Sequence, residues 1–398
     1  MLKERKSFEE RLKQEAHSRI VKILKETTES SADLQINHTP PEICSMMLDK
    51  VDLSSAKNVL ALFNVEFLYE LRLREYKGDV YYFTQSEKEV AVAKELMPNV
   101  IIKYIDKKES ALEYMNTWPE KFDIIVSNPP YAKYLHIKFI EKSLFLCKGK
   151  MIFVHPSNSF VNKKTGNDVY EKFNGIIESK LEEVFLFNGC GIFGINLFTP
   201  CSITTMSHKR EGGIKIINKL TNQTYDVNRI SEITQLKSDE RLWKIKTKID
   251  SYVQLNGSLD DILKTKGKGG DFMIDFTRIR GHIENKGDID SKIHKKDFFT
   301  FVSHKTRVEK KDTPKYDLWF RFKTEKEALG LLKYLKSDFA RFSLSLYKFS
   351  QSLNNGELRY IPLIDFTQEW TDARLYEHFG ITEEEQAFIK EIIPPYYD

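Results

Sequence analysis

The sequence predicts a doubly wound α/β domain of seven strands, followed by a second domain of mixed α+β pattern. Strand-like and helix-like segments alternate from Asn58 to about Lys209, which is typical of a parallel sheet covered on both faces. The segment 122–127 (FDIIVS) is almost continuously apolar, as expected of a strand buried on both sides. The periodicity becomes mixed after Gly212, so we expect the domain boundary near Gly212–Gly213.

Each element is predicted from the spacing of its apolar residues and from the residues at its ends that break helices or strands. The expected strands are 58–63, 79–83, 100–105, 122–127, 151–154, 183–187 and 201–206. The expected helices are 1–25, 39–50, 65–76, 86–96, 109–118, 136–146, 170–180 and 325–348. We therefore divide the chain into an N-terminal helical segment (1–30), an α/β domain (31–212) and a C-terminal domain (213–398).

Composition restricts the class of protein. The chain has 398 residues, which is enough for two cores, and 30% charged and 12% aromatic residues exclude a disordered chain. A net charge of +4 permits a nucleic-acid partner without demanding one. The four cysteines lack CxxC spacing and no apolar run is long enough to span a bilayer. We expect a cytoplasmic protein with reduced cysteines and no membrane association.

The most informative motif is the tetrad Asn128-Pro129-Pro130-Tyr131, which directly follows the expected strand 122–127. Open α/β sheets bind their ligands beyond the carboxyl ends of their strands. The Asn128 side-chain oxygen and the Pro129 carbonyl are two acceptors on a stiff loop, and Tyr131 offers a flat face to a planar group. Such acceptors can hold the hydrogens of a conjugated amine and draw its lone pair out of conjugation. The plain alternative is a proline turn capped by asparagine.

The tetrad resembles the catalytic motif of S-adenosylmethionine-dependent amino-methyltransferases, which include adenine-N6 DNA methyltransferases and release-factor glutamine methyltransferases. The segment Thr39-Pro40-Pro41-Glu42, before the first strand, favours the first branch because it resembles a segment of gamma-class adenine-N6 enzymes. That resemblance implies that Thr39 contacts the methionine end of the cofactor, with Pro40 beside it. As a local signal, the segment predicts a helix with Thr39 as N-cap and Pro40 at the first helical position.

The glycine-rich cofactor turn of this family is absent. No glycine lies within 58–77, so we expect Asn64 to adopt the left-handed backbone conformation and Glu66 to supply a carboxylate. The acid that usually ends the second strand, where it binds ribose, is also absent, and the segment reads Phe83-Thr84-Gln85. Asp106 follows the third strand, where the resemblance implies an acid near the adenine amino group. The resemblance thus implies cofactor contacts from Thr39, Pro40, Asn64, Glu66, Asp106 and Asn128.

Two further positions lie near the later strands. In the resembled family, an aromatic residue before the seventh strand packs against the flipped base. Phe193 is the expected residue and Phe198 the second choice, with core packing an equal alternative for Phe193. His155 follows the fifth strand, and we interpret it as structural, because amine methylation at such a site needs no imidazole.

The C-terminal domain mixes basic and aromatic residues. This mixture favours a DNA-facing surface, although a solvated lysine face explains any single residue as well. The basic residues are Arg278, Arg280, Lys295, Lys296, Lys305, Arg307, Lys310 and Lys311, and the aromatic ones Phe272, Phe276, Phe298, Phe299 and Phe301. The tail from 361 to 380 loosely resembles that of restriction-modification methylases of the Eco57I-like group.

These observations predict a site-specific DNA methyltransferase that moves a methyl group from S-adenosylmethionine to N6 of an adenine flipped out of double-stranded DNA. Asn128 and Pro129 would hold the amine on a catalytic loop that Pro130 stiffens, and Tyr131 and Phe193 would stack on the base; no metal is required. A restriction-modification partner subunit and a bacterial or phage-infected host cell are implied. The alternatives are a methyltransferase-like DNA-binding protein with little or no activity, and a protein glutamine N5-methyltransferase.

Overall fold

The computed structural model describes residues 38–106, 109–161, 168–189, 192–193, 200–233, 236, 239–263, 270–276, 282–283, 289, 293–294, 299–303, 305–311, 313–316, 318–348, 353 and 355–396. The described residues form two compact units. The first contains those up to Ile233 together with Ile289, and the second contains the rest. The expected helix 1–25 lies outside the described residues.

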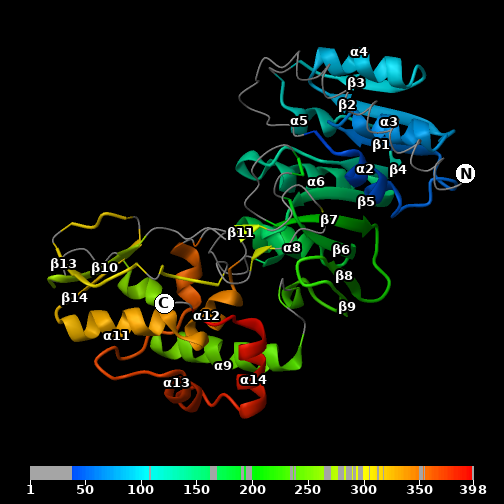
Figure 1. Cartoon of the computed structure of the whole chain (residues 1–398). Coiled ribbons are helices and arrows are strands. Elements are labelled where there is room, and N and C mark those ends of the chain that lie inside the picture. The colour runs from blue at the N-terminus through cyan, green and yellow to red at the C-terminus, as the bar shows by residue number, and fades with distance from the viewer. Residues whose placement is uncertain are drawn as a thin grey trace, which may run out of the picture. The chain divides into compact units, whose positions relative to one another are not determined.

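The first unit is built on a nine-stranded sheet of described residues, in the order β3-β2-β1-β4-β5-β7-β6-β8-β9 (Figure 1). Strands β1 to β5 are parallel, and β7 runs antiparallel to both of its neighbours. The strands are β1 (Asn58–Leu62), β2 (Asp79–Thr84), β3 (Ile101–Tyr104), β4 (Phe122–Ser127), β5 (Cys147–Pro156), β6 (Leu181–Asn188), β7 (Pro200–Ser207), β8 (Ile214–Asn218) and β9 (Gln223–Val227). The predicted α/β class is confirmed.

Helices cover both faces of this sheet, as the apolar strands require. They are α2 (Pro41–Leu48), α3 (Glu66–Leu73), α4 (Glu87–Leu96), α5 (Ala111–Met115), α6 (Leu135–Leu146), α7 (Asn158–Val161) and α8 (Asp168–Ile177). Side chains of α2, α3 and α4 share one core with alternate residues of β1, β4 and β5. On the other face, Phe63 meets Phe139 of α6, and Phe83 meets Trp118 beyond α5. Cys44, Cys147 and Cys201 are buried free thiols, as predicted.

The boundary predicted at Gly212–Gly213 is wrong by about one hairpin. Strand β8 pairs in parallel with β6, and β9 pairs with β8, so the sheet continues past these glycines and the first unit extends to Ile233. Gly212 has a φ of +86° and forms the turn into β8, not a linker. The two glycines therefore lie in a connection between two strands of one sheet and not between two domains.

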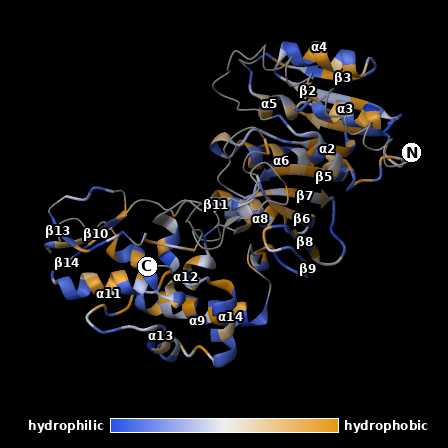
Figure 2. Ribbon diagram, viewed as in Figure 1, coloured by the Kyte–Doolittle hydropathy of each residue, from blue (hydrophilic) through white to orange (hydrophobic). Residues whose placement is uncertain are grey.

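The second unit packs helices against a small antiparallel sheet. Its strands are β10 (Phe272–Phe276), β13 (Glu309–Lys310) and β14 (Leu318–Phe322), with β10 central, and a separate pair β11 (His282–Ile283) and β12 (Ile293–His294). Its α-helices are α9 (Glu240–Asn256), α11 (Glu325–Lys336), α12 (Asp338–Ser345), α13 (Asp372–His378) and α14 (Glu383–Ile392). Apolar and polar residues alternate along α11 in Figure 2, and Ala328, Leu331 and Leu335 are buried.

Two predictions for this unit need correction. The helix expected over 325–348 is two helices, because Ser337 is extended and caps α12. The aromatic residues assigned to a DNA-facing surface lie in the core instead, with Phe276, Phe299 and Phe301 no more than 4% exposed. Of the basic residues, Lys305, Arg307 and Lys310 are exposed. Arg278, Arg280, Lys295, Lys296 and Phe298 lie outside the described residues.

Candidate active site at the strand ends

The candidate site lies where the strand order reverses. Strands β1, β2 and β3 follow one another towards one edge of the sheet, whereas β4 and β5 follow one another towards the other edge. The switch point therefore falls between β1 and β4. Leu62 and Ser127 are paired at the carboxyl ends of these strands. Immediately beyond them, the Asn128 backbone N–H donates to the Asn64 side-chain oxygen at 3.1 Å. The sheet thus brings both asparagines to the position where such folds bind ligands.

The side chain of Asn128 joins two distant segments. Its Nδ2 donates to the Thr39 hydroxyl at 3.1 Å, and its Oδ1 accepts from the Tyr131 hydroxyl at 2.5 Å. Thr39 and Asn128 are almost fully buried. Thr39 is not the helix cap that the sequence predicted: Pro40 is the N-cap residue of α2, without a side-chain capping bond, and Pro41 begins the helix. The Thr39 hydroxyl is therefore directed to the tetrad and not to the helix backbone.

The turn after β1 adopts the glycine-like conformation without glycine. The residue in the left-handed region is Phe63, with a φ of 69°, and not Asn64 as predicted. The Phe63 ring is fully buried, with its centroid 5.1 Å from that of Phe83 and 4.7 Å from that of Phe139. Because the ring packs into the core, the bulky side chain does not cover Asn64 at the strand end.

Two buried carboxylates adjoin this turn. Glu66, at the start of α3, lies within hydrogen-bond distance of His38, whose Nδ1 is 2.7 Å from Oε1. Glu89, on α4, accepts hydrogen bonds from the Tyr82 hydroxyl at 2.8 Å and from Thr84, the last residue of β2. Burial, with a smaller effect from the charge of Glu66, raises the pKa of Glu89 to about 7 against the opposing effect of these hydrogen bonds.

Sequence reasoning missed Glu89. It found no acid ending β2 and took the ribose-binding position to be without one. The structure supplies a carboxylate to that strand end from the following helix, through the contact with Thr84. A signal was available, because Ser86 and Glu89 form an S-x-x-E pattern, and the Ser86 side chain accepts from the Glu89 N–H as N-cap of α4.

Two other expected residues lie further from this network. Asp106 is exposed beyond β3, and its backbone carbonyl accepts from Gln85. Phe193 is 6% exposed and packs in the sheet core, its ring centroid 6.4 Å from that of Phe187. Contact between Phe193 and a base would require this ring to be uncovered. Phe198, the second choice, lies outside the described residues.

Two stacked imidazole rings pack beside Tyr131. The Tyr131 ring meets His136 edge-on with centroids 5.9 Å apart, and His136 stacks on His155 at 5.8 Å. Burial lowers the pKa of His136 to about 3 and that of His155 to about 4, so both imidazoles are neutral near pH 7. His155 Nδ1 lies 2.9 Å from the Pro156 carbonyl and Nε2 lies 3.3 Å from the Thr204 hydroxyl, which agrees with the structural role expected for it.

No cluster of three or more metal-ligating side chains occurs among the described residues. None of the helices that the structure describes has the length and hydropathy that a bilayer crossing requires.

Comparison with known proteins shows remote likenesses. No family model matches the chain. A curated relative, 4-hydroxyphenylpyruvate dioxygenase of Neurospora crassa, is 34% identical over 108 residues, and the match spans 26% of this chain and 25% of that protein.

Among solved structures, a modification subunit of a putative type I restriction enzyme from Vibrio vulnificus aligns with a TM-score of 0.39 at 13% identity, covering 51% of each chain. A putative class I S-adenosylmethionine-dependent methyltransferase from Listeria monocytogenes aligns with a TM-score of 0.37 at 16% identity, covering 50% of this chain and 69% of the other. With TM-scores this low, function has to be argued from the residues.

Proposed function

We propose that the chain is an S-adenosylmethionine-dependent methyltransferase whose substrate is the N6 amine of an adenine rotated out of duplex DNA. The observation that carries the proposal is the buried network of Thr39, Asn128 and Tyr131 at the switch point between β1 and β4. The network converges on an amide whose oxygen can accept an N–H of an amine. An adenine in the duplex is stacked, so its N6 could reach such a buried site only after base flipping.

The residues would act by positioning. Asn128 Oδ1 and the Pro129 carbonyl accept the two amine hydrogens, which turns the nitrogen lone pair out of conjugation with the ring. In this structure the Tyr131 hydroxyl donates to Asn128 Oδ1, so this hydrogen bond must break when the amine binds. Thr39 fixes the other end of the amide, because it accepts from Nδ2 and thereby sets which end of the amide faces the substrate. Alignment of this kind accounts for a large part of catalysis without an acid or base.

The residues present fit the cofactor. S-adenosylmethionine, when bound, supplies an electrophilic methyl group. The Phe63 ring is packed in the core, so that side chain does not cover Asn64 at the strand end. Glu66 and Glu89 offer carboxylates of the type that hold amino and ribose hydroxyl groups, and Thr39 is tied to Asn128 of the tetrad. Asp106 lies at the neighbouring strand end, where it would face the adenine amino group.

The C-terminal unit would hold the DNA. Exposed Lys305, Arg307 and Lys310 follow one another along a short segment of this unit, and phosphate neutralisation by such groups underlies most DNA affinity. A restriction-modification partner subunit belongs to the proposal, since the chain carries no motif that we recognise as a nuclease.

One specific observation favours a second candidate function. Asn64, Asn128 and Glu66 are no more than 3% exposed, which favours a chain that binds DNA and binds the cofactor weakly or not at all. A protein glutamine N5-methyltransferase is less well supported, because the Thr39 segment reaches the tetrad, as in the DNA branch it resembles.

The test is methyl transfer by the full chain and by Asn128→Ala. We expect the wild type to incorporate labelled methyl groups into genomic DNA, recovered as N6-methyladenine by mass spectrometry. Asn128→Ala should lower the rate by about a hundredfold or more, as does removal of one preorganised hydrogen-bonding group in other enzymes. Asn116→Ala, at an exposed position, is the matched control.

Two results would count against the proposal. If Asn128→Ala methylated DNA at the wild-type rate, the tetrad would not be the catalytic site. If the wild type gave no heat with millimolar S-adenosylmethionine and no methyl transfer, the inactive DNA-binding alternative would be favoured.

A further inference from the structure

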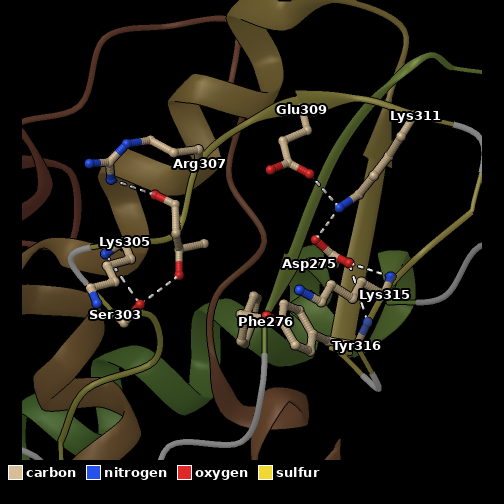
Figure 3. A pocket seen from close by; sticks show the side chains of 10 residues that line it. Asp275, Phe276, Ser303, Lys305, Arg307, Glu309, Lys311, Lys315 and Tyr316 are labelled. Atoms are coloured by element: carbon tan, nitrogen blue, oxygen red, sulfur yellow. Dashed lines mark hydrogen bonds and ion pairs between the residues drawn. The ribbon is translucent and has the colours of Figure 1, made fainter.

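A cavity of about 190 Å³ lies wholly within the second unit, outside the site described above (Figure 3). Its lining includes four cationic side chains and two carboxylates, a surplus of two positive charges. The cations are Lys305, Arg307, Lys311 and Lys315, and the acids are Asp275 and Glu309. The cavity is smaller than the roughly 300–1,000 Å³ of sites that enclose a whole organic ligand, so it suits one charged group of a larger partner.

One wall is fixed by a buried carboxylate. Asp275 on β10 accepts from Lys311 Nζ at 2.6 Å, and from the backbone N–H groups of Lys315 at 2.6 Å and Tyr316 at 3.3 Å. Burial would raise the pKa of Asp275, but these hydrogen bonds outweigh it and lower the pKa below the usual value. Asp275 is therefore an anchored anion that holds the 315–316 turn in place, with its charge already matched.

The second carboxylate is also engaged. Lys311 Nζ lies 2.6 Å from Glu309 as well as from Asp275, and Figure 3 shows it between the two. Because a lysine ammonium already bridges the two acids, they do not form a cation site. Lys305 and Lys315 also line the cavity, and both are exposed, while the Arg307 guanidinium donates to the Thr306 carbonyl at 3.0 Å.

The opposite wall offers hydroxyl groups. Ser303 and Thr306 form a turn in which the Thr306 N–H donates to the Ser303 carbonyl at 3.0 Å, and their hydroxyl oxygens lie 3.3 Å apart. Thr306 is 8% exposed, whereas the neighbouring Lys305 and Arg307 extend into solvent. Hydroxyl groups beside exposed cationic side chains are the chemistry that proteins use to contact phosphate oxygens.

We propose that this cavity binds one phosphate group of the DNA backbone, with one hydroxyl of the Ser303–Thr306 pair donating to its oxygens and Lys305 and Lys315 neutralising its charge. The DNA source rests on the proposed function, since a free phosphate has the same chemistry. A backbone phosphate is favoured because the cationic segment continues past the cavity to Lys310, so that a longer anion could follow it.

The experiment measures the affinity of the full chain for a fluorescent DNA duplex at several salt concentrations. The variant is the double substitution Lys305→Gln and Lys315→Gln. The control is Lys326→Gln with Lys390→Gln, which removes the same charge from exposed positions outside the cavity. We expect the variant to bind about tenfold more weakly near 0.1 M salt. The magnitude of the slope of log affinity against log salt concentration should fall by roughly 0.9, which corresponds to the loss of about one phosphate contact. The control should change neither quantity.

A titration with inorganic phosphate separates the two sources. If the variant lost phosphate binding but kept wild-type DNA affinity and salt slope, the site would serve a free phosphate and the DNA assignment would be overturned. Equal losses in the variant and in the control would also overturn it, because the effect would then be general charge. Failure of the catalytic proposal is seen separately, in cofactor binding and methyl transfer, neither of which enters this measurement.

Discussion

The pH dependence of cofactor binding gives a direct test of Glu89. If the Glu89 carboxylate accepts hydrogen bonds from cofactor hydroxyl groups, it must be ionised to bind. With a pKa of about 7, it is ionised in about one tenth of molecules near pH 6 and in about nine tenths near pH 8. The affinity for S-adenosylmethionine should therefore rise about tenfold between these two conditions, which is roughly 1.4 kcal/mol of binding free energy.

The assay is calorimetric titration of the full chain with S-adenosylmethionine, or with S-adenosylhomocysteine, at both pH values. The α-amino group of either ligand titrates near pH 8, so a control is needed for the ligand itself. Glu89→Gln provides it, because the amide oxygen can still accept from Tyr82 and Thr84 but does not titrate. We expect the variant to lose the tenfold dependence while retaining any contribution from the ligand.

Equal affinities for the wild type near pH 6 and pH 8 would refute the reasoning, as would a Glu89→Gln variant with the full wild-type dependence. The first result would show that the carboxylate does not meet the ligand, and the second that another group titrates. Direct observation of the carboxyl group by carbon NMR should give a midpoint about 2.5 pH units above the ordinary value of 4.5.

Three further predictions concern the tetrad, the turn and the stacked imidazole rings. The methylation rate of Tyr131→Phe should be within about threefold of the wild-type rate, because the substitution frees the Asn128 oxygen and keeps the ring. Tyr131→Ala should lose about 1–3 kcal/mol of base stacking, which would be measured as a higher KM for DNA. Phe63→Gly should relieve about 1–2 kcal/mol of backbone strain but lose about 3–5 kcal/mol of packing, so urea unfolding should show a net destabilisation. The folded-state pKa values of His136 and His155 lie below the unfolded value of 6.5, so stability is present above that pH and is lost as the pH falls. Between about pH 7 and pH 5 each should account for roughly 2 kcal/mol, measurable by thermal unfolding.

Each of these has an outcome that contradicts it. A Tyr131→Phe variant as inactive as Tyr131→Ala would show that the hydroxyl takes part in the reaction. A Phe63→Gly variant more stable than wild type would mean that strain exceeds packing at this turn. An acid sensitivity unchanged in the double variant His136→Phe and His155→Phe would place its origin elsewhere.

The sequence was most informative where structure is local. Each strand from β1 to β7 was located because buried parallel strands are short apolar runs between helical segments. The sequence does not predict that β8 and β9 belong to the sheet, because a hairpin of two five-residue strands after Gly213 has the same local pattern whether it extends this sheet or begins another domain. Which edge it pairs with is a long-range choice that periodicity does not encode.

In the candidate site, too, some residues are identifiable from local sequence, whereas the role of others depends on contacts between distant segments. The tetrad was recognisable as a motif, and the switch point then placed Asn128 beside Asn64. Glu89 was missed because its carboxylate reaches the end of β2 from a different element, across a turn, so its importance depends on side-chain direction. Thr39 contacts the tetrad through Asn128, but its predicted local role as helix cap is wrong, because the helix starts one residue later and Pro40 is its N-cap.

The turn at Phe63 bears on whether the missing glycines exclude a working site. Glycine supplies two separate properties there, a left-handed backbone at low energy and the absence of a side chain near the ligand. Phe63 keeps the first at a cost of about 1–2 kcal/mol, which burial of its ring offsets by about 1.5–3 kcal/mol. It keeps the second because the ring is packed against Phe83 and Phe139 in the core. The loss of glycine therefore changes how the turn is stabilised, while Asn64 and Glu66 still follow it at the strand end. Under the proposed function, cofactor affinity would then depend on those two side chains and on Glu89, which is why the ionisation of Glu89 is the quantity to measure.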